Sequence, residues 1–327
     1  MSLIIARSPL RISLGGGGTD LQSYYSKFGS HFVSAAISKF TYVIVKDSFL
    51  PGIHLKYSQQ ESCNTIDEVR HPLFRECLRV ADIENPRIEI TSLADIPSGT
   101  GLGSSGSFTT ALLKALHAYK GIDISNYELA DLAALVEMKI LGDPVGKQDP
   151  FISVFAGISS FTIDFEGRVE VSPLKLHTAT LVQLEENLHM FYTGITRRAK
   201  DILKDQELKS NELEVQENLH SVKALGFESK SLLEQGNIKE FAKNMTTQWE
   251  KKKNRSQFAS TTHIDEAFQL GLKSGAIGGK LIGAGGGGFL LFYAENSSRL
   301  RMAMAGVGLL EVKFQFEFQG TKLLVPK

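Results

Sequence analysis

Residues 97–107 read Pro97-Ser98-Gly99-Thr100-Gly101-Leu102-Gly103-Ser104-Ser105-Gly106-Ser107. Glycine at three alternate positions disfavours helix and strand, tolerates positive φ and lets the backbone approach a ligand closely. Apolar, strand-like residues 87–90 precede this segment, and the apolar, helical pattern of residues 108–119 follows it. The N–H groups and the dipole at the start of a helix attract anions, phosphate above all. A flexible linker is the alternative, but apolar neighbours on both sides favour a phosphate-binding loop.

Two other glycine-rich segments indicate further close contacts between backbone and ligand. Residues 15–18 are four glycines, and residues 283–288 hold five glycines between apolar stretches. A tight hairpin needs only two such residues, so the second run exceeds what a turn requires. Arg11 precedes the first run, and Thr19 and Asp20 follow it. Either Thr19 or Asp20 could instead cap the helix predicted at residues 21–28.

Two acidic residues lie where a chain often carries chemistry. Glu137 stands near the end of a predicted helix, residues 128–140, for which Asn126 is the expected cap. Asp149 lies in residues 142–150, a loop with two glycines, two prolines and three charges between apolar elements. Polar groups on such loops are frequently functional. Taken without the rest of the chain, either carboxylate could be an ordinary surface acid.

The remaining patterns alternate between strands and helices. Strand-like stretches lie at residues 3–5, 11–14, 31–37, 41–45, 53–57, 157–165, 181–192, 289–293 and 311–318. Helical patterns lie at residues 71–80 and 264–273, and residues 197–255 are helix-rich and heavily charged. The change of composition places a domain boundary near residues 165–180. Residues 251–255, Lys-Lys-Lys-Asn-Arg, are typical of a solvated face, with contact to phosphate as the alternative.

The composition restricts the class of protein. Of 327 residues, 42% are hydrophobic, which supports a substantial core. The 36 basic and 36 acidic side chains balance, which argues against nucleic acid as the main partner. Cys63 and Cys77 lack metal-ligand spacing, as expected of a reduced, cytoplasmic protein. No apolar run reaches about 18 residues and the N-terminal one is short, so we expect neither a membrane span nor a signal peptide.

Simple nucleotide-binding motifs do not fit. The Walker pattern needs Ser or Thr after Gly-Lys, but Gln148 follows Gly146-Lys147 and Leu281 follows Gly279-Lys280. Residues 101–106 match the dinucleotide string Gly-x-Gly-x-x-Gly, yet a second helix is predicted where that fold needs a strand. The protein-kinase signatures His-Arg-Asp and Asp-Phe-Gly are absent from the sequence.

The three glycine segments, in this order and spacing, resemble the GHMP kinase superfamily. The first motif is residues 7–20, the second residues 97–107 and the third residues 280–288, so the resemblance covers nearly the whole chain. It implies an α+β, two-domain fold with the active site in the cleft between the domains. A ribosomal-protein-like N-terminal domain would span residues 1–170. A ferredoxin-like C-terminal domain would span residues 171–327 and close the substrate cleft.

Details within the motifs narrow the resemblance. Gly16-Gly17-Gly18-Thr19-Asp20 stands where galactokinases carry Gly-Glu-His-Thr-Asp. Together with residues 146–149, Gly-Lys-Gln-Asp, and residues 193–197, Thr-Gly-Ile-Thr-Arg, it is similar to the D-glycero-α-D-manno-heptose 7-phosphate kinases. This implies phosphorylation at the anomeric hydroxyl to the 1,7-bisphosphate, for GDP-heptose synthesis and surface polysaccharide. The alternatives are a fucose- or galactose-type sugar 1-kinase, a diphosphomevalonate-type decarboxylase and a non-catalytic sugar sensor.

The resemblance also assigns expected roles to residues, with ATP and Mg²⁺ as cofactors. Asp149 would orient or deprotonate the acceptor hydroxyl, and Arg11 would stabilise the transferring phosphate. Ser105, with Ser104 as the close alternative, and Glu137 would bind Mg²⁺. The expected ATP-binding residues are Pro97, Gly99, Gly101, Leu102, Gly103, Ser104, Ser105 and Gly106. The expected substrate-binding residues are Asp20, Thr19, Gly17, Gly18, Gly286, Gly287, Arg197 and Lys147.

A phosphate on the sugar needs a cationic site of its own. Arg197 and Arg198 follow the Thr-Gly-Ile-Thr turn, and Lys147 is a third candidate. Arginine is suited to bidentate contact with phosphate. All three could instead be surface charges. We expect ATP and a sugar phosphate as the ligands, neither nucleic acid nor membrane as a partner, and a homodimer is compatible with the sequence.

Overall fold

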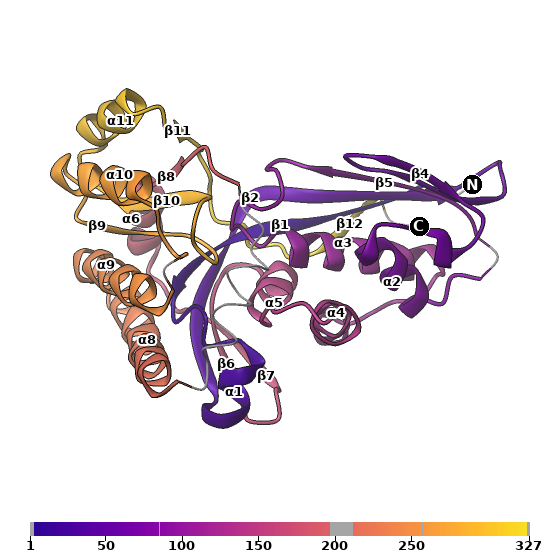
Figure 1. Ribbon diagram of the computed structural model, residues 1–327, viewed down its shortest axis with the longest axis horizontal. Helices are drawn as coiled ribbons and strands as arrows, with labels where there is room; N and C mark the ends of the chain where they lie inside the picture. Colours follow the sequence, from indigo (N-terminus) through magenta and orange to yellow (C-terminus); the bar gives the residue numbers. More distant parts are fainter. Residues whose placement is uncertain (1–2, 85, 197–211, 257, 326–327) are drawn as a thin grey trace.

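The computed structural model describes residues 3–84, 86–196, 212–256 and 258–325 (Figure 1). Within these ranges the strands form two sheets. The first has the order β12-β1-β2-β5-β3-β4, and β6 and β7 continue it from the other half of β2. All its pairs are antiparallel except β3 with β5. Its strands are β1 (Leu3–Gly15), β2 (Ser30–Asp47), β3 (Gly52–Lys56), β4 (Gln60–Cys63), β5 (Arg87–Ala94), β6 (Ile158–Ile163), β7 (Val169–Pro173) and β12 (Lys322–Val325).

The second sheet is smaller and has the order β11-β8-β10-β9, all antiparallel. Its strands are β8 (Leu188–Tyr192), β9 (Gly278–Leu281), β10 (Phe289–Tyr293) and β11 (Leu310–Glu311). The helices α8 (Leu213–Glu234), α9 (Ile238–Arg255), α10 (Thr262–Lys273) and α11 (Ser297–Gly306) gather around this sheet (Figure 1). The mixed, two-sheet architecture confirms the predicted α+β class.

Helices cover one face of the first sheet. They are α2 (Pro72–Val80), α3 (Ser104–Tyr119), α4 (Asn126–Ala134) and α5 (Gln148–Phe155), while α1 (Gln22–Phe28) lies near β6 and β7 (Figure 1). The short η1 (Ile66–Glu68) precedes α2, and α6 (Thr178–Asn187) precedes β8. Helix α3 is the centre of this layer, because most of its side chains are buried between the sheet and the other helices. Its largely apolar sequence, in which Lys114 is the one Lys, Arg, Asp or Glu, permits burial on several sides.

Strand β1 contributes side chains to the two largest hydrophobic cores of the described chain. The sequence predicts two short strands around Pro9, but the structure has one strand with a register shift between Pro9 and Leu10. A bulge accommodates proline, which has no N–H for the ladder. Before the shift, Ile4 packs in the core beneath the first sheet; after it, Ile12 packs in the core shared with the second sheet. Arg11 therefore lies where the strand passes from one core to the other.

Several predicted boundaries are wrong. The stretches at 31–37 and 41–45 belong to one strand, β2. Residues 181–192 form the end of α6 and then β8 rather than one strand, because the amphipathic helix ends at Asn187. Residues 311–318 contain only the end of β11 and an isolated bridge between Ile37 and Phe316. The alternating pattern there reflects one-sided packing against the cores without a continuous partner strand.

Two helix starts also differ from the prediction. Ser125 rather than Asn126 caps α4, because its side chain and that of Glu128 form a reciprocal capping box. Helix α1 follows Leu21 without a side-chain cap, so neither Thr19 nor Asp20 serves as one. The helix predicted at 128–140 changes form at Leu135, where a π-helix, η2 (Leu135–Ile140), carries Glu137. Short π-helical segments occur frequently at functional sites.

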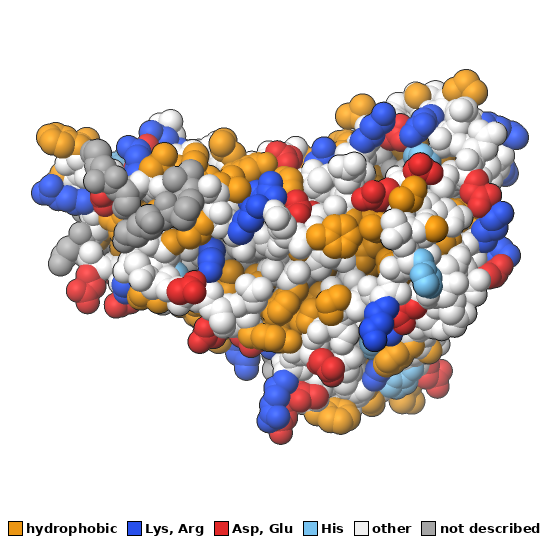
Figure 2. Space-filling model, turned by 180° about the vertical axis from the view of Figure 1, so that it is seen from behind, with side chains coloured by type: hydrophobic (Ala, Val, Ile, Leu, Met, Phe, Trp, Pro, Cys, Tyr) orange, Lys and Arg blue, Asp and Glu red, His pale blue; other side chains and the backbone are white. Residues whose placement is uncertain are grey.

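The division at residue 170 stays a prediction. Strand β7 straddles that position, and β12, from the C-terminal end of the described chain, pairs with β1 in the first sheet. In the part of the chain that the structure describes, no helix is long and apolar enough to cross a membrane. Charges of both signs are interspersed on the face shown in Figure 2, in keeping with the balanced formal charge.

Stability should depend on His31 below neutral pH. Its ring stacks on Phe227 of α8 at 3.7 Å, and its buried Nδ1 has no partner. Burial, assisted by Lys230 and Lys223, lowers its pKa to about 4. The unfolded chain therefore binds a proton below about pH 6.5 that the folded protein binds only near pH 4, and stability falls as pH drops through this range.

The expected loss through His31 between pH 8 and pH 5 is about 2 kcal/mol. Chemical unfolding of the wild type and of His31→Phe at both pH values measures it, since phenylalanine keeps the stack and cannot titrate. The variant should lose less stability on acidification by that amount. An identical pH dependence of the two proteins would contradict the prediction.

Candidate active site

The alternate glycines of residues 97–107 are required by the backbone. Gly99, Gly101 and Gly103 have φ of 78°, 83° and 74°, a region that side chains disfavour. Gly103 is the N-terminal cap of α3, so Ser104 and Ser105 lie in the first helical turn. The loop thus delivers its backbone to the start of a buried helix, the arrangement that favours an anion.

A cavity of about 990 Å³ opens beside this loop. Its wall combines the first glycine segment, the phosphate loop, the acidic residues and the end of α9. The chemically relevant lining residues are Arg11, Ser13, Gly17, Gly18, Asp20, Gly99, Gly101, Gly103, Ser104, Ser105, Glu137, Gln148, Asp149, Gln248, Lys252, Arg255, Lys280, Gly283 and Ala284. Residues from all three glycine segments therefore meet at one cavity.

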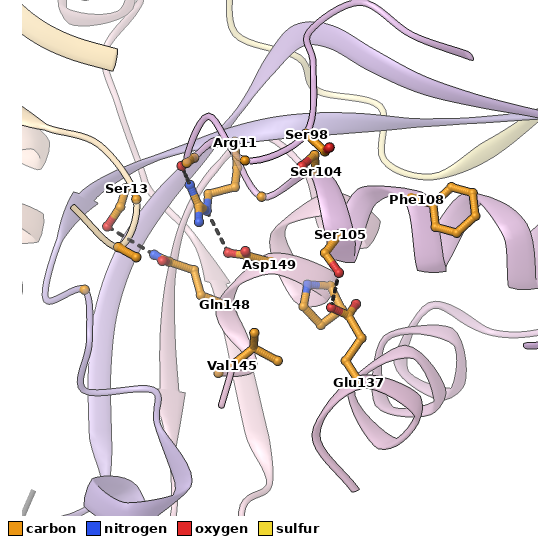
Figure 3. A pocket seen from close by; sticks show the side chains of 18 of the residues that line it. Arg11, Ser13, Ser98, Ser104, Ser105, Phe108, Glu137, Val145, Gln148 and Asp149 are labelled. Atoms are coloured by element: carbon orange, nitrogen blue, oxygen red, sulfur yellow. Dashed lines mark hydrogen bonds and ion pairs between the residues drawn. The ribbon is translucent and has the colours of Figure 1, made fainter. Parts of the chain in front are cut away.

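Arg11 joins the phosphate loop to Asp149. Its Nε donates to Asp149 Oδ1 at 2.7 Å, and its Nη1 donates to the carbonyl of Gly101 at 2.5 Å (Figure 3). Its backbone N–H donates to the carbonyl of Leu102 at 3.0 Å. Asp149 lies in the first turn of α5, not in a loop as the sequence suggested. A helix N-terminus stabilises the carboxylate there.

Ser105 and Glu137 lie next to each other in the wall of the same cavity. Ser105 Oγ donates to Glu137 Oε2 at 2.5 Å, and Glu137 Oε1 is buried without a partner (Figure 3). Burial above all, with the charges of Asp149 and Asp143, raises the pKa of Glu137 to about 7. In the described chain, no three His, Cys, Asp or Glu side chains gather to hold a metal ion. A serine hydroxyl and an unpaired carboxylate oxygen nevertheless fit Mg²⁺, which takes few protein ligands beside phosphate and water.

Asp20 lies on the first glycine segment with its carboxylate buried. It accepts hydrogen bonds from the N–H of Gly18 at 3.1 Å and of Gln148 at 3.2 Å. Desolvation, then the charge of Asp149, raises its pKa. A Cβ on Gly146 would collide with this carboxylate, which explains that glycine. Gln148 also donates through Nε2 to Ser13 Oγ at 3.2 Å (Figure 3). Asp20, Gln148 and Ser13 thus form a polar wall opposite Glu137.

The basic run at 251–255 is not simply a solvated face. Arg255 is buried and Lys252 is partly buried, and both line the cavity with buried Lys280 of β9. Desolvation first, then neighbouring cations, lowers the pKa of Lys280 to about 7 and that of Lys252 well below its usual value. A signal was present in the sequence, since Met245, Lys252 and Arg255 share one helical face.

Some predicted site residues do not reach the cavity. Thr19 is buried and donates through Oγ1 to the carbonyl of Gly16 at 2.8 Å, so it holds the glycine segment in shape. Leu102 packs in a core, and Pro97 accepts from Thr100 Oγ1. Gly106 permits α3 to approach α5, since a Cβ would lie 2.8 Å from Pro150 N. These residues shape the loops around the site and are absent from the cavity wall.

Several of the predicted sugar-binding residues lie outside the cavity wall. The N–H of Gly286 donates to Ala259 and a Cβ on Gly287 would lie 2.7 Å from the carbonyl of Ile195, so these glycines serve packing. Gly283 and Ala284 line the cavity instead. Lys147 points away, donating to Asp131 at 3.1 Å and to the carbonyl of Gly167 at 2.6 Å. Arg197 and Arg198 lie outside the described residues.

The far end of the cavity is more apolar. Leu73, Leu93, Ile96 and Phe108 line it, together with Tyr57 and His71. Phe108 lies one helical turn after Ser104 on α3, so the polar loop and the apolar end adjoin (Figure 3). The sequence contained no local signal for this end, because its residues come from α2, α3 and β5 and the segments beside them.

Comparison with known proteins agrees with this geometry. Residues 66–157 match the GHMP kinases N terminal domain, and residues 229–305 match the GHMP kinases C terminal family. The chain is 27% identical over 316 residues to the D-glycero-alpha-D-manno-heptose 7-phosphate kinase of Campylobacter jejuni, covering 93% of each protein. It is 27% identical over 337 residues to the L-fucokinase/L-fucose-1-P guanylyltransferase of Bacteroides fragilis, covering 90% of this chain and 35% of that protein.

Solved structures share the fold. A D-glycero-D-manno-heptose 1-phosphate kinase from Bacteroides thetaiotaomicron superposes with a TM-score of 0.80 at 24% identity, covering 98% of this chain and 99% of that one. The Lactococcus lactis galactokinase complexed with galactose gives 0.78 at 16% identity, covering 98% and 95%. At these identities the likeness concerns the fold alone.

Proposed function

The chain belongs to the GHMP kinases and is an ATP-dependent sugar kinase, and we propose that its acceptor is the anomeric hydroxyl of D-glycero-α-D-manno-heptose 7-phosphate. The product would be the 1,7-bisphosphate. The observation that carries the proposal is the Arg11–Asp149 ion pair bonded to the carbonyl of Gly101. It brings an acid, a cation and the phosphate loop to one point of the cavity. The similarity to the Campylobacter jejuni kinase supports the choice of sugar.

In this proposal Asp149 acts on the acceptor hydroxyl, and Arg11 acts on the phosphoryl group that is transferred. Asp149 accepts the proton of the anomeric hydroxyl while that oxygen bonds to the γ-phosphorus of ATP. The bond from phosphorus to the bridging oxygen breaks, and ADP leaves with that oxygen. Arg11 has further guanidinium N–H groups beside the one that holds Asp149, and they stabilise charge on the transferring group. The ion pair keeps Asp149 in place before the sugar arrives.

ATP would lie along the cavity from the glycine loop to the apolar end. The N–H groups of residues 99–105 would hold its phosphates at the start of α3. Leu73, Ile96 and Phe108 offer an apolar surface for the adenine. Ser105 and Glu137 would hold Mg²⁺, which neutralises phosphate charge when bound. Before that, the hydrogen bond between Ser105 and Glu137 fixes both side chains.

The sugar would lie on the opposite side of Asp149, against the first glycine segment. Gly17 and Gly18 expose backbone to the cavity, and Asp20 is held by two N–H donors with capacity left to accept sugar hydroxyls. Gln148 lines the same wall. We propose that the site closes between an N-terminal domain, residues 1–170, and a C-terminal domain, residues 171–327. Lys252 and Arg255 contribute from the second of these.

An acceptor panel tests the proposal. The purified protein is assayed for ADP release with heptose 7-phosphate, heptose, mannose 6-phosphate, fucose, galactose and mevalonate. We expect turnover with heptose 7-phosphate at a kcat/KM at least tenfold above that of the other compounds. Phosphorus NMR should show a new anomeric phosphate on the sugar. Preference for fucose, which the similarity to the Bacteroides fragilis protein keeps as the second candidate, would overturn the choice of heptose 7-phosphate.

A further inference from the structure

Arg255 is a buried cation that forms no ion pair within the part of the chain that the structure describes. It ends α9, and its Nε is buried with no hydrogen-bond partner. Among the described residues no carboxylate forms a salt bridge with it, and its guanidinium lies directly over Gly18, where a Cβ would come within 2.6 Å of Nη1. Burial lowers its pKa to about 10, against the favourable charge of Asp20. Burying an unpaired guanidinium costs folding free energy unless an anion pairs with it.

The wall of the cavity beside the first glycine segment, residues 15–18, carries more positive than negative side chains among the described residues. Arg11 is paired with Asp149 at 2.7 Å. Lys280 donates to the side-chain oxygen of Gln248 at 3.4 Å, and that oxygen also accepts from the N–H of Gly16. Asp20 is the acid that faces Arg255, and it already accepts two backbone N–H groups. The wall beside the first glycine segment therefore has more cationic than anionic character in the described chain.

Lys252 and Arg255 lie on different sides of the cavity, one near the phosphate loop and the other near the first glycine segment. Lys252 donates to the carbonyl of Gly283, and Gly283 packs on Gly101, so this lysine belongs to the phosphate-loop side. Arg255 lies on Gly18, next to Asp20, and so belongs to the side where the acceptor would lie. An anion at Arg255 is thus a second one, separate from the triphosphate cradled by residues 99–105.

We propose that Arg255, assisted by Lys280, binds the phosphate that the acceptor already carries, and so selects phosphorylated over free sugars. This inference rests on the proposed function. The guanidinium is suited to it because two of its N–H groups can bind two phosphate oxygens at once. The glycine at position 18 leaves the space that the guanidinium occupies. The assignment replaces Lys147, whose ammonium is engaged elsewhere.

The test compares Arg255→Met, Arg255→Lys and the matched control Lys243→Met. Lys243 is a cation of the same helix, with a side chain 61% exposed. Each protein is assayed with heptose 7-phosphate, with free heptose and for its KM for ATP. Arg255→Met should lower kcat/KM for heptose 7-phosphate about 10- to 150-fold, as expected for a hydrogen bond to a charged group. The loss with free heptose should be at least tenfold smaller, and Lys243→Met should match the wild type.

The outcomes separate this inference from the proposed function. If the wild type does not prefer heptose 7-phosphate to heptose, the proposed function fails and the inference fails with it. If the wild type prefers it and Arg255→Met keeps that preference, only the inference is overturned. Equal losses with both sugars would also overturn it. Should Arg255→Met not fold, Arg255→Lys decides, because a lysine keeps the charge but should still raise the KM for the phosphorylated sugar selectively.

Discussion

Asp149→Asn should lower kcat by about 100- to 10,000-fold, the usual contribution of a positioned acid or base. The amide keeps the shape of the side chain and can still contact Arg11, but it cannot take the proton of the acceptor hydroxyl. The KM for ATP should stay within about threefold, because the nucleotide would contact residues 99–105 rather than Asp149. Steady-state kinetics with saturating sugar, together with ATP binding measured by calorimetry, provide the measurement.

A matched control separates this effect from a general loss of charge. Asp123→Asn removes a carboxylate that is 98% exposed and pairs with Lys114 at 3.3 Å. We expect this variant to keep wild-type kinetics, since exposed ion pairs contribute little. Near-normal turnover of Asp149→Asn would remove Asp149 from the mechanism. A collapse of ATP binding in that variant would instead assign Asp149 a structural role in holding the loop.

Arg11→Met should lower kcat by about 100- to 1,000-fold, the range found when a donor to developing negative charge is removed. The methionine keeps much of the packing in β1 but loses the bonds to Asp149 and to the carbonyl of Gly101. Arg11→Lys should recover part of the rate, because it restores the charge but not the forked geometry. Stopped-time ADP assays over a range of ATP and sugar concentrations distinguish effects on kcat from effects on KM.

The double variant Arg11→Met/Asp149→Asn tests whether the pair acts as a unit. Residues that share one ion pair in a site give non-additive losses. We therefore expect the double variant to be close to the worse of the two single variants, not to the product of both losses. A multiplicative loss would mean that the two side chains act independently, which contradicts the role given to their 2.7 Å contact.

The features that the sequence predicted correctly are those that depend on residues close together in the chain. The alternate glycines at 99, 101 and 103 predicted the phosphate loop because each needs a positive φ at its own position. Glu137 and Asp149 were singled out from helical pattern, loop composition and family resemblance, and both line the cavity. The roles assigned to them are proposals that the variants above test.

The residues that we expected in the site but that lie outside the cavity wall share one physical explanation. Lys147 and Asp149 are two positions apart, yet α5 begins between them, so one side chain turns to Asp131 and the other into the cavity. Residues 286–287 resemble residues 283–284 in composition, but contacts with Ile195 and Ala259 take them out of the cavity wall. Composition alone did not distinguish such neighbours, because their difference lies in which distant segment each one meets.

The sequence by itself determined the three glycine segments and the buried α3, since backbone conformation and hydrophobic periodicity are local properties. The α+β class was predicted from the resemblance of the motifs to a known family. Only the tertiary structure decided that β1 contributes to the two largest cores of the described chain and that β12 returns to the first sheet. It also decided that Arg255, at the end of a charged run, is buried against Gly18, 237 residues earlier in the sequence. Burial of a cation depends on which elements pack over it, and that is settled by contacts across the whole chain.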